Sequence, residues 1–381
     1  MNIIIYSVSF WPNLGGVEDV GNTMASELTQ LGCDVTVITP MRLSEEVQER
    51  NTNYKIVRAP QPNELQALIE KADLIHFNGA SFAILPQVLK QRKPCTASYH
   101  GYQLQCIDGA GWVYGKAAPM KPVDSFVFHA GETGLPRAIA GGGKLLLRRM
   151  AAYFLSANIA TSKIQMELQP LPKQRLIYNP VDTEFFRVSS LEKAVAELEG
   201  SNSDFTFMGR LISEKGGSSL LYALKDLCLR LTKNVTLKFI GDGPERENLI
   251  QLAKDLGLQN QVSFVGAKKD KELLDEIRRS GIFIQPSIWV EPGALSTVEL
   301  LAAGKPLIVS KHGSLSEYAG PACLTFENGS AAELALRMEA LLANKQLQKK
   351  LIEQGLLRLA LFDPQNQCRQ YLELFKELLS S

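Results

Sequence analysis

The sequence has no apolar run that reaches the roughly 18 residues a membrane-spanning helix requires. Its first ten residues, MNIIIYSVSF, lack the basic segment that opens a secretory signal peptide, and they are typical of a β-strand. We therefore expect neither a signal peptide nor a membrane span, so that any contact with a membrane is peripheral.

Cysteine is scarce and shows no pattern. The six cysteines, at positions 33, 95, 106, 228, 323 and 368, form no CxxC pair and no spacing typical of metal ligands. The sequence also lacks HxxxH and Asp-x-Asp. These absences favour a reducing, cytoplasmic compartment and predict no bound metal and no cofactor.

Positive and negative side chains nearly balance over the chain as a whole, with 41 Lys and Arg against 40 Asp and Glu. The net charge is +1, so nothing predicts binding to nucleic acid. Residues 90–149 depart from this balance with nine basic and three acidic side chains, a net +6. This stretch would attract an anionic membrane by about 1 kcal/mol per nearby Lys or Arg, although an ordinary solvated surface fits equally well. The basic residues are Lys90, Arg92, Lys93, Lys116, Lys121, Arg137, Lys144, Arg148 and Arg149.

Short apolar strands alternate with helical patterns along the whole chain. A length of 381 residues, 45% of them hydrophobic and 21% charged, fits a globular enzyme of two domains. Nearly continuous apolar strands between helices predict parallel sheets covered on both faces. We therefore predict an α/β protein of two Rossmann-like, doubly wound domains that face a cleft. The predicted strands are 3–8, 34–38, 54–58, 74–77, 96–100, 159–160, 175–178, 205–208, 236–240, 262–265, 282–285, 307–309 and 324–326.

The domain boundary is expected between Phe185 and Asp204. This segment is polar, and a Gly-Ser-Asn-Ser cluster lies at its end. We assign residues 1–190 to an N-terminal domain, 191–363 to a C-terminal domain, and 364–381 to a helix that can cross back to the first domain. Residues 101–143 are rich in Gly and Ala. We expect them to be irregular, forming either a functional loop or a disordered segment.

The segment EPGALSTVE places Glu291 and Glu299 on either side of a predicted helix start, directly after an apolar strand. Amides at a helix N-terminus favour an anion, and a carboxylate can accept two hydrogen bonds from a vicinal diol. Ligands of a parallel sheet bind beyond the carboxyl ends of its strands. The segment therefore suits a ligand with a phosphate and several sugar hydroxyls. The spacing of the two glutamates alone is weak evidence, because such pairs also occur by chance.

Two further loops follow strands at this kind of edge. Gly15 and Gly16 precede a helix, where backbone amides could approach a phosphate or sugar closely, or simply form a strand-to-helix turn. In MGRLISEKGG, Arg210 and Lys215 could clamp a diphosphate; alternatively they are two solvated surface charges. GDGPERENL resembles a nucleotide-binding turn only superficially, and GGGKLL at 141–146 is not a Walker A loop.

Histidines end two neighbouring predicted strands. His76 ends one as IHFNG, and His100 ends the next as YHGY, with Asn78 at the same edge. A lone histidine there is more often structural, but the pair favours one that faces a ligand. His129 and His312 have weaker contexts.

In order and spacing, these motifs resemble the retaining GT-B glycosyltransferases of glycosyltransferase family 4. The resemblance covers nearly the whole chain. The matching segments are PNLGGVEDV, DLIHFNG, SYHG, IYNPVDTEFF, MGRLISEKGG, IGDGPERENL, SFVGAKKD and EPGALSTVE.

The resemblance implies a role for each matching residue. Arg210 and Lys215 would hold the donor diphosphate, Glu299 the ribose hydroxyls and Glu291 the transferred sugar. His100 would lie beside that sugar. The remaining donor contacts would come from the Gly15–Gly16 loop, from the backbone near Val265 and Gly266 under the base, and from the amides of Gly293, Ala294 and Leu295. The first domain would bind the acceptor and the second the donor.

The sequence departs from the family in two places. Gly293 and Ala294 stand where the family has an aromatic residue and then glycine, and GSLSE at 313–317 replaces Gly-Gly-x-Pro-Glu. Both changes bear on the identity of the donor.

These inferences predict a metal-independent glycosyltransferase that moves a sugar from a UDP- or GDP-type donor to the hydroxyl of a saccharide or lipid-linked acceptor, with retention, in polysaccharide or glycolipid biosynthesis. Retention by double displacement needs a carboxylate nucleophile; the resemblance instead implies front-face attack, with the leaving phosphate taking the acceptor proton. Two alternatives stay open, a nucleotide-sugar epimerase of the same architecture and a non-catalytic nucleotide-sugar-binding scaffold. A Rossmann dehydrogenase is disfavoured because GxGxxG is missing after the first strand.

Overall fold

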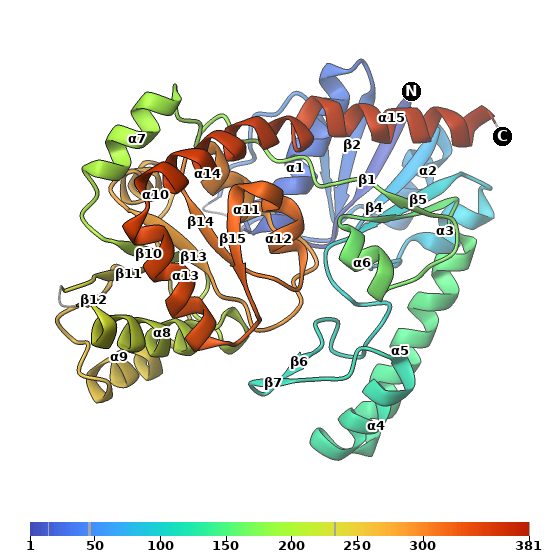
Figure 1. Cartoon of the computed structure of the whole chain (residues 1–381). Coiled ribbons are helices and arrows are strands. Elements are labelled where there is room, and N and C mark those ends of the chain that lie inside the picture. The colour runs from blue at the N-terminus through green and yellow to red at the C-terminus, as the bar shows by residue number, and fades with distance from the viewer. Residues whose placement is uncertain (14, 45–46, 232–233, 381) are drawn as a thin grey trace. The chain divides into compact units, whose positions relative to one another are not determined.

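The computed structural model describes residues 1–13, 15–44, 47–231 and 234–380. Leu14 of the glycine-glycine segment and Ser381 of the predicted C-terminal helix lie outside them. The chain divides into two compact units (Figure 1). Unit 1 comprises Met1–Val113, Ala117–Asp182 and Leu361–Ser381, and unit 2 comprises Tyr114–Lys116 and Thr183–Ala360.

Unit 1 is built on a seven-stranded sheet in the order β3-β2-β1-β4-β5-β8-β9. Each pair of neighbouring strands is parallel. The strands are β1 (Asn2–Tyr6), β2 (Asp34–Thr39), β3 (Lys55–Arg58), β4 (Leu74–Asn78), β5 (Cys95–Tyr99), β8 (Ala157–Ala160) and β9 (Gln174–Leu176). The helices are α1 (Gly16–Gln30), α2 (Pro62–Lys71), α3 (Leu85–Lys90), α4 (Pro122–Glu132), α5 (Leu135–Phe154), α6 (Lys163–Leu168) and α15 (Pro364–Ser380).

Strand β1 shows why the first sheet is covered on both faces. Its side chains alternate between two cores: Ile3 and Ile5 pack in one, and Ile4 and Tyr6 in the other. The first core also receives buried residues of α1 and of α15, so the C-terminal helix is part of unit 1.

Unit 2 contains a six-stranded sheet in the order β12-β11-β10-β13-β14-β15, again with parallel neighbours. The strands are β10 (Phe205–Met208), β11 (Leu237–Ile240), β12 (Val262–Phe264), β13 (Ile282–Gln285), β14 (Leu307–Ser310) and β15 (Cys323–Phe326). The helices are α7 (Leu191–Glu199), α8 (Gly217–Arg230), α9 (Arg246–Asp255), α10 (Asp270–Arg278), α11 (Leu295–Ala302), α12 (Ser314–Ala319), α13 (Ala331–Ala343) and α14 (Lys345–Arg358), with 3-10 turns η1 (Ser213–Lys215), η2 (Gly320–Ala322) and η3 (Leu359–Leu361).

The prediction of two doubly wound, parallel α/β sheets is confirmed. Each predicted strand corresponds to a strand of one of these sheets: 205–208 and 282–285 match the observed bounds, and the ends of the others differ by at most two residues. The short pair β6 (Trp112–Val113) and β7 (Lys116–Ala117) was not predicted.

The expectation that residues 101–143 are irregular is wrong. Helix α4 and the first half of α5 lie in this stretch, and the glycines 141–143 are inside α5. Each helical glycine costs about 1 kcal/mol relative to alanine, but two of these glycines permit close packing. A Cβ on Gly141 would lie 2.5 Å from Ile107, and one on Gly142 would lie 3.1 Å from Phe126 of α4.

Candidate functional site

Glu291 is the central residue of the loop between β13 and α11. Its side chain is buried, and the ammonium Nζ of Lys215 lies 2.6 Å from its Oε1. The hydroxyl of Ser287 donates a hydrogen bond to the same oxygen. The backbone is fixed as well, because the Ser314 amide donates to the Glu291 carbonyl at 2.9 Å. Two donors on one oxygen fix the position of this carboxylate beside the end of β13.

Lys215 reaches Glu291 because the turn η1 presses against the end of β13. Gly216 follows Lys215 with a φ of 73°, and a Cβ there would lie 2.0 Å from the carbonyl oxygen of Pro286. The Ile288 amide donates to the carbonyl of Glu214 at 2.9 Å. Only glycine suits this close, left-handed position. The Lys-Gly-Gly sequence thus joins the two loops.

A cavity of about 180 Å³ opens beside this pair at the carboxyl edge of the second sheet. It brings together three of the predicted catalytic residues, Arg210, Lys215 and Glu291. Arg210 is exposed, and its guanidinium has no hydrogen bond or ion pair within the described part of the chain. Ser287, Gln285 and Ser296 also line the cavity and were not predicted as site residues.

The sequence could have pointed to two of these extra residues, because Gln285 ends a buried strand and Ser287 follows it, at the sheet edge where ligands bind. The Gln285 amide donates to Ser296 Oγ at 2.9 Å and accepts from Thr297 Oγ1 at 2.7 Å. It therefore ties the end of β13 to the first turn of α11, where predicted donor contacts lie.

Among these contacts, Leu295 is the first residue of α11, and Glu299 lies one turn into the helix, partly buried. Ala294 precedes the helix and is 2% exposed, with a φ of −131°. A negative φ explains why alanine fits at this departure from the family pattern. Gly293, directly before it, is partly buried.

Val265 and Gly266 follow β12 at the same sheet edge. The Gly241 amide donates to the Gly266 carbonyl at 2.9 Å. Side chains are excluded at both turn glycines next to them: a Cβ on Gly241 would lie 1.9 Å from the Gly209 carbonyl, and one on Gly243 would lie 2.4 Å from that of Leu211. The GDG turn is thus required by packing between neighbouring loops. Val265, Gly266, Glu299 and the 293–295 backbone do not line the cavity.

The predicted site residues of unit 1 gather at the carboxyl edge of the first sheet. His100 follows β5, and its Nε2 lies 2.7 Å from Oδ1 of Asn78 at the end of β4. The Asn78 amide nitrogen donates to the Val17 carbonyl, 3.0 Å away in the first turn of α1. Asn78 thereby connects His100 to the helix that begins at Gly16, with Gly15 before it.

This network sets the tautomer of His100. Because the Asn78 nitrogen is used as a donor, its Oδ1 accepts from Nε2–H, which leaves Nδ1 of His100 as an acceptor. Burial lowers the pKa of His100 to about 4, so the ring is neutral at neutral pH.

His76 does not belong to the site. It is fully buried, with its ring nitrogens 2.8 Å from Thr96 Oγ1 and 3.1 Å from Ser98 Oγ. Tyr371 of α15 packs edge-on against the His76 ring, with the two ring centroids 5.4 Å apart. Burial lowers the pKa of His76 to about 3. It is a core histidine that supports the C-terminal helix.

A second polar cavity of about 180 Å³ lies near His100 in unit 1, lined in part by Asn78, Gln103 and Arg148. Burial lowers the pKa of Arg148, and its guanidinium has no hydrogen bond or ion pair to any described residue. The buried Oε1 of Gln103 has no hydrogen-bond partner there either. Sequence reasoning counted Arg148 only as a basic residue and missed Gln103.

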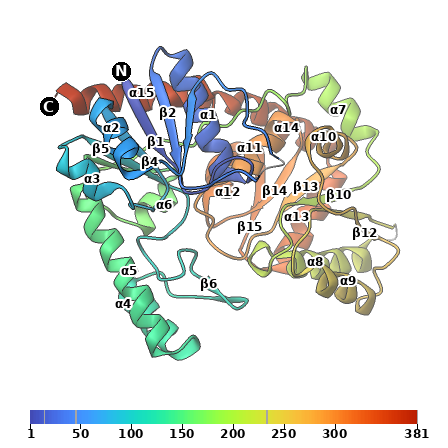
Figure 2. The same ribbon diagram turned by 180° about the vertical axis from the view of Figure 1, so that it is seen from behind.

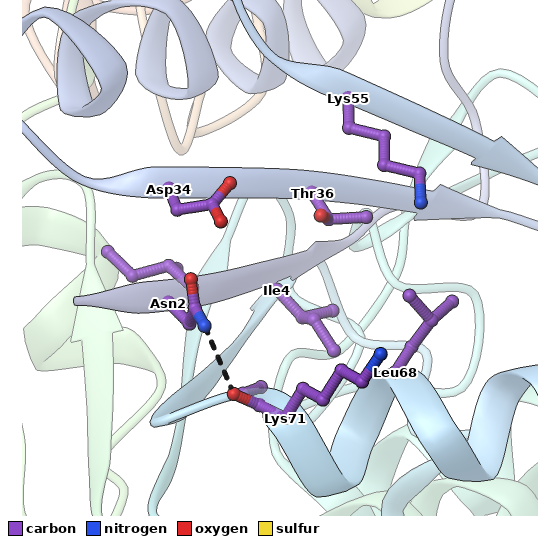
Figure 3. A pocket seen from close by; sticks show the side chains of 9 residues that line it. Asn2, Ile4, Asp34, Thr36, Lys55, Leu68 and Lys71 are labelled. Carbon is purple, nitrogen blue, oxygen red and sulfur yellow. Dashed lines mark hydrogen bonds between the residues drawn. The ribbon is translucent and has the colours of Figure 1, made fainter.

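A further hollow of unit 1 lies at the opposite, amino-terminal edge of the sheet (Figure 3). Lys55 and Lys71 extend into it beside Asp34, and the Asn2 side chain donates to the Lys71 carbonyl at 3.3 Å. None of the predicted site residues lines it. Ligands of parallel sheets bind at the other edge.

No cluster of three or more His, Cys, Asp or Glu side chains is arranged to hold a metal ion among the described residues. Within the same residues, no helix combines the length and the apolar character needed to cross a membrane.

Comparison with known proteins places both halves of the chain. Residues 14–185 match the profile of Glycosyltransferase Family 4, and residues 190–358 match Glycosyl transferases group 1. A 2-deoxystreptamine glucosyltransferase of Streptomyces kanamyceticus is 26% identical over 71% of this chain and 68% of its own length. The lipopolysaccharide core biosynthesis glycosyltransferase LpsE of Rhizobium meliloti is 28% identical over 44% of this chain and 48% of its own.

The chain spans 39% of an uncharacterized glycosyltransferase of Methanocaldococcus jannaschii, to which it is 29% identical. Solved structures match over the full length. Sucrose-phosphate synthase from Thermosynechococcus elongatus has a TM-score of 0.74 with 20% identity, over 100% of this chain and 99% of its own. Anabaena HepE, solved in complex with UDP, has a TM-score of 0.72 with 20% identity, over 99% and 100%.

The two parallel α/β units and these structural matches define the class, which is the GT-B fold of glycosyltransferases. The chain belongs to glycosyltransferase family 4: residues 14–185 match the model of that name, and residues 190–358 match the model of Glycosyl transferases group 1.

Proposed function

We propose that this chain transfers a sugar from a nucleoside diphosphate sugar of the UDP or GDP type to an acceptor hydroxyl, with retention at the anomeric carbon and without a metal ion. The cavity of unit 2 carries the proposal, because it combines two cations with one anchored carboxylate. The name of the Streptomyces relative, a glucosyltransferase, and the UDP complex of HepE support the donor class.

Each residue of the cavity suits a step of this transfer. Breaking the bond to the donor phosphate leaves negative charge on the diphosphate, which Arg210 and Lys215 would neutralise. Lys215 uses one of its three N–H donors on Glu291, so two are available for phosphate oxygens. The amides at the start of α11 would add to this stabilisation.

Glu291 suits a binding role better than a nucleophilic one. Its Oε1 already accepts hydrogen bonds from Lys215 and Ser287, which lowers its reactivity toward carbon and leaves it suited to accept a hydrogen bond from a sugar hydroxyl. Retention without a carboxylate nucleophile favours front-face attack, in which the leaving phosphate takes the acceptor proton. Glu299 would bind the ribose hydroxyls, and the backbone at Val265 and Gly266 would contact the base.

The acceptor would bind in unit 1. Its polar cavity offers the guanidinium of Arg148 and the unpartnered oxygen of Gln103, which together suit a hydroxylated acceptor that carries a phosphate or carboxylate. Such groups occur in saccharide and lipid-linked acceptors, so we place the reaction in polysaccharide or glycolipid biosynthesis. All six cysteines are free, which favours the reducing cytoplasm.

The donor is tested by a thermal-shift panel of UDP, GDP and ADP sugars. A ligand at 100 times its Kd stabilises the protein by about 2.7 kcal/mol, so the true donor raises Tm clearly above the others. The Arg210→Ala variant should lose this shift. Donor incubated alone and followed by NMR should remain unchanged; an isomerised nucleotide sugar would identify an epimerase instead. If no nucleotide sugar shifts Tm, the proposed donor class is wrong.

A further inference from the structure

Exposed apolar side chains are concentrated on helices α4 and α5. Among the described residues, nineteen large hydrophobic side chains are exposed, and nine of them lie within residues 122–154. Single exposed apolar residues are ordinary, but a concentration in one short segment marks an interaction surface. The nine are Val123, Val127, Leu135, Ile139, Leu146, Leu147, Met150, Tyr153 and Phe154, between 51% and 74% exposed.

Seven of them form one stripe along α5. Leu135, Ile139, Leu146, Met150 and Tyr153 follow one another at spacings of four, seven, four and three residues. At about 100° per residue these spacings return to the same side of a helix. The remaining two, Leu147 and Phe154, widen the stripe to about 120°. This stripe is the outer face of α5.

The opposite side of α5 is occupied within unit 1. Ala138, Leu145 and Ala152 are its buried residues, and α4 lies alongside (Figures 1 and 2). The α4–α5 pair is also anchored to the loop after β5, because the Ile107 amide donates to Ser125 Oγ of α4 at 3.1 Å. The outer face therefore does not belong to the core that the same helix helps to form.

Basic side chains border the stripe. At about 100° per residue, Lys144 lies about 60° beyond Leu147, and Arg137 about 80° beyond it. Both are exposed, as is Lys121 directly before α4. A helix with an apolar face and flanking lysines and arginines lies in the plane of a membrane surface, with the apolar side chains among the acyl chains and the cations at the phosphates.

We propose that the outer face of α5, extended by α4, docks this protein on an anionic membrane surface. The inference locates the contact that the basic stretch 90–149 suggested, and it does not depend on the proposed transfer reaction. A membrane-spanning helix is not involved, since none of the described helices has the required length and apolarity.

Charge decides between a membrane and a second copy of the chain. Residues 121–154 carry five basic and two acidic side chains. A symmetric dimer would place the same patch on both partners, so two positively charged surfaces would meet, which is unfavourable. An anionic lipid surface supplies the opposite charge and covers the apolar stripe at the same time.

The test is flotation of the full chain with vesicles, once with phosphatidylcholine alone and once with phosphatidylcholine mixed with phosphatidylglycerol. The wild-type protein should float with the anionic vesicles and much less with the neutral ones. Leu146→Glu should lower this binding about tenfold or more, because it places a charge in the apolar stripe. Lys144→Gln should lower it about fivefold.

Leu229→Glu is the matched control, since Leu229 on α8 of unit 2 is 75% exposed and should float like the wild type. Circular dichroism verifies that each variant folds. The proposal is overturned if the wild type does not float, or if Leu146→Glu floats equally well. It is also overturned if sedimentation without lipid shows a dimer that Leu146→Glu dissociates while no vesicles bind.

Discussion

Lys215 and Glu291 are 76 positions apart in sequence, and their Nζ and Oε1 atoms lie 2.6 Å apart. Glu291 is almost fully buried, whereas Lys215 keeps a quarter of its side chain exposed. The pair therefore combines two functions: it balances a buried charge, and it presents the remaining N–H groups of the lysine to the cavity.

Replacing Lys215 with alanine should separate these functions. The buried carboxylate loses its partner, so we expect the free energy of unfolding to fall by about 1–3 kcal/mol, together with nearly all transfer activity. The double variant Lys215→Ala, Glu291→Gln should recover most of the stability, since a neutral amide needs no cation, but not the activity. Urea denaturation measures the first effect. An unchanged urea midpoint for Lys215→Ala would show that the ion pair does not stabilise the fold.

Arg210→Ala should impair the enzyme without destabilising it. Arg210 is exposed and makes no ion pair within the described residues, so Tm should stay unchanged. Loss of a charge-assisted hydrogen bond to phosphate costs about 1.5–3 kcal/mol, which predicts a ten- to hundredfold lower kcat/KM for the donor. The control is Arg230→Ala, which removes a surface pair with Asp226 on α8. Full turnover of Arg210→Ala would refute the diphosphate contact.

Glu299→Gln should chiefly raise the donor KM. The substitution keeps the shape of the side chain and weakens its hydrogen bonds to the ribose hydroxyls, which predicts about a tenfold increase. Glu353→Gln, an exposed position of α14, is the control. The measurement is initial rate against donor concentration, and an unchanged KM would contradict the ribose role.

Local pattern was enough to predict the two sheets and to place the candidate site residues at their carboxyl edges. The strands are short, apolar and buried. Because they are parallel, the residues that follow them lie at the same carboxyl edge of the sheet. The same logic predicted Arg210, Lys215 and Glu291, which share one cavity.

What sequence reasoning missed depends on tertiary contacts. Residues 141–143 look like a loop in sequence, but they lie inside α5, where Gly141 packs closely against Ile107 and Gly142 against Phe126. His76 and His100 end neighbouring strands, yet His76 packs under Tyr371 from the far end of the chain. No local pattern distinguishes these two histidines.

Arg148→Ala should affect the acceptor and not the donor. Arg148 lines the polar cavity of unit 1, so its loss should raise the acceptor KM about tenfold for an acidic acceptor and leave the donor-induced Tm shift intact. Arg149→Ala is a sharp comparison, because Arg149 donates to the Leu104 carbonyl at 2.7 Å and should lower stability instead. Equal acceptor KM values for Arg148→Ala and the wild type would remove Arg148 from the acceptor site.

His100 should give the folded protein a specific pH dependence. Its pKa is about 4 in the folded state because the ring is buried, against about 6.5 in an unfolded chain. Below about 6.5 the unfolded chain therefore binds a proton that the folded protein does not. Stability should be fully present above this pH and fall as the pH drops toward about 4.

His100→Gln tests this dependence, because the glutamine amide can still donate to Asn78 but does not titrate. In urea denaturation between about pH 4 and pH 7, the variant should lose stability less steeply than the wild type, by up to about 1.4 kcal/mol per pH unit. A residual slope should remain, since His76 is also buried and neutral. Equal slopes for variant and wild type would show that the pKa of His100 is not lowered by folding.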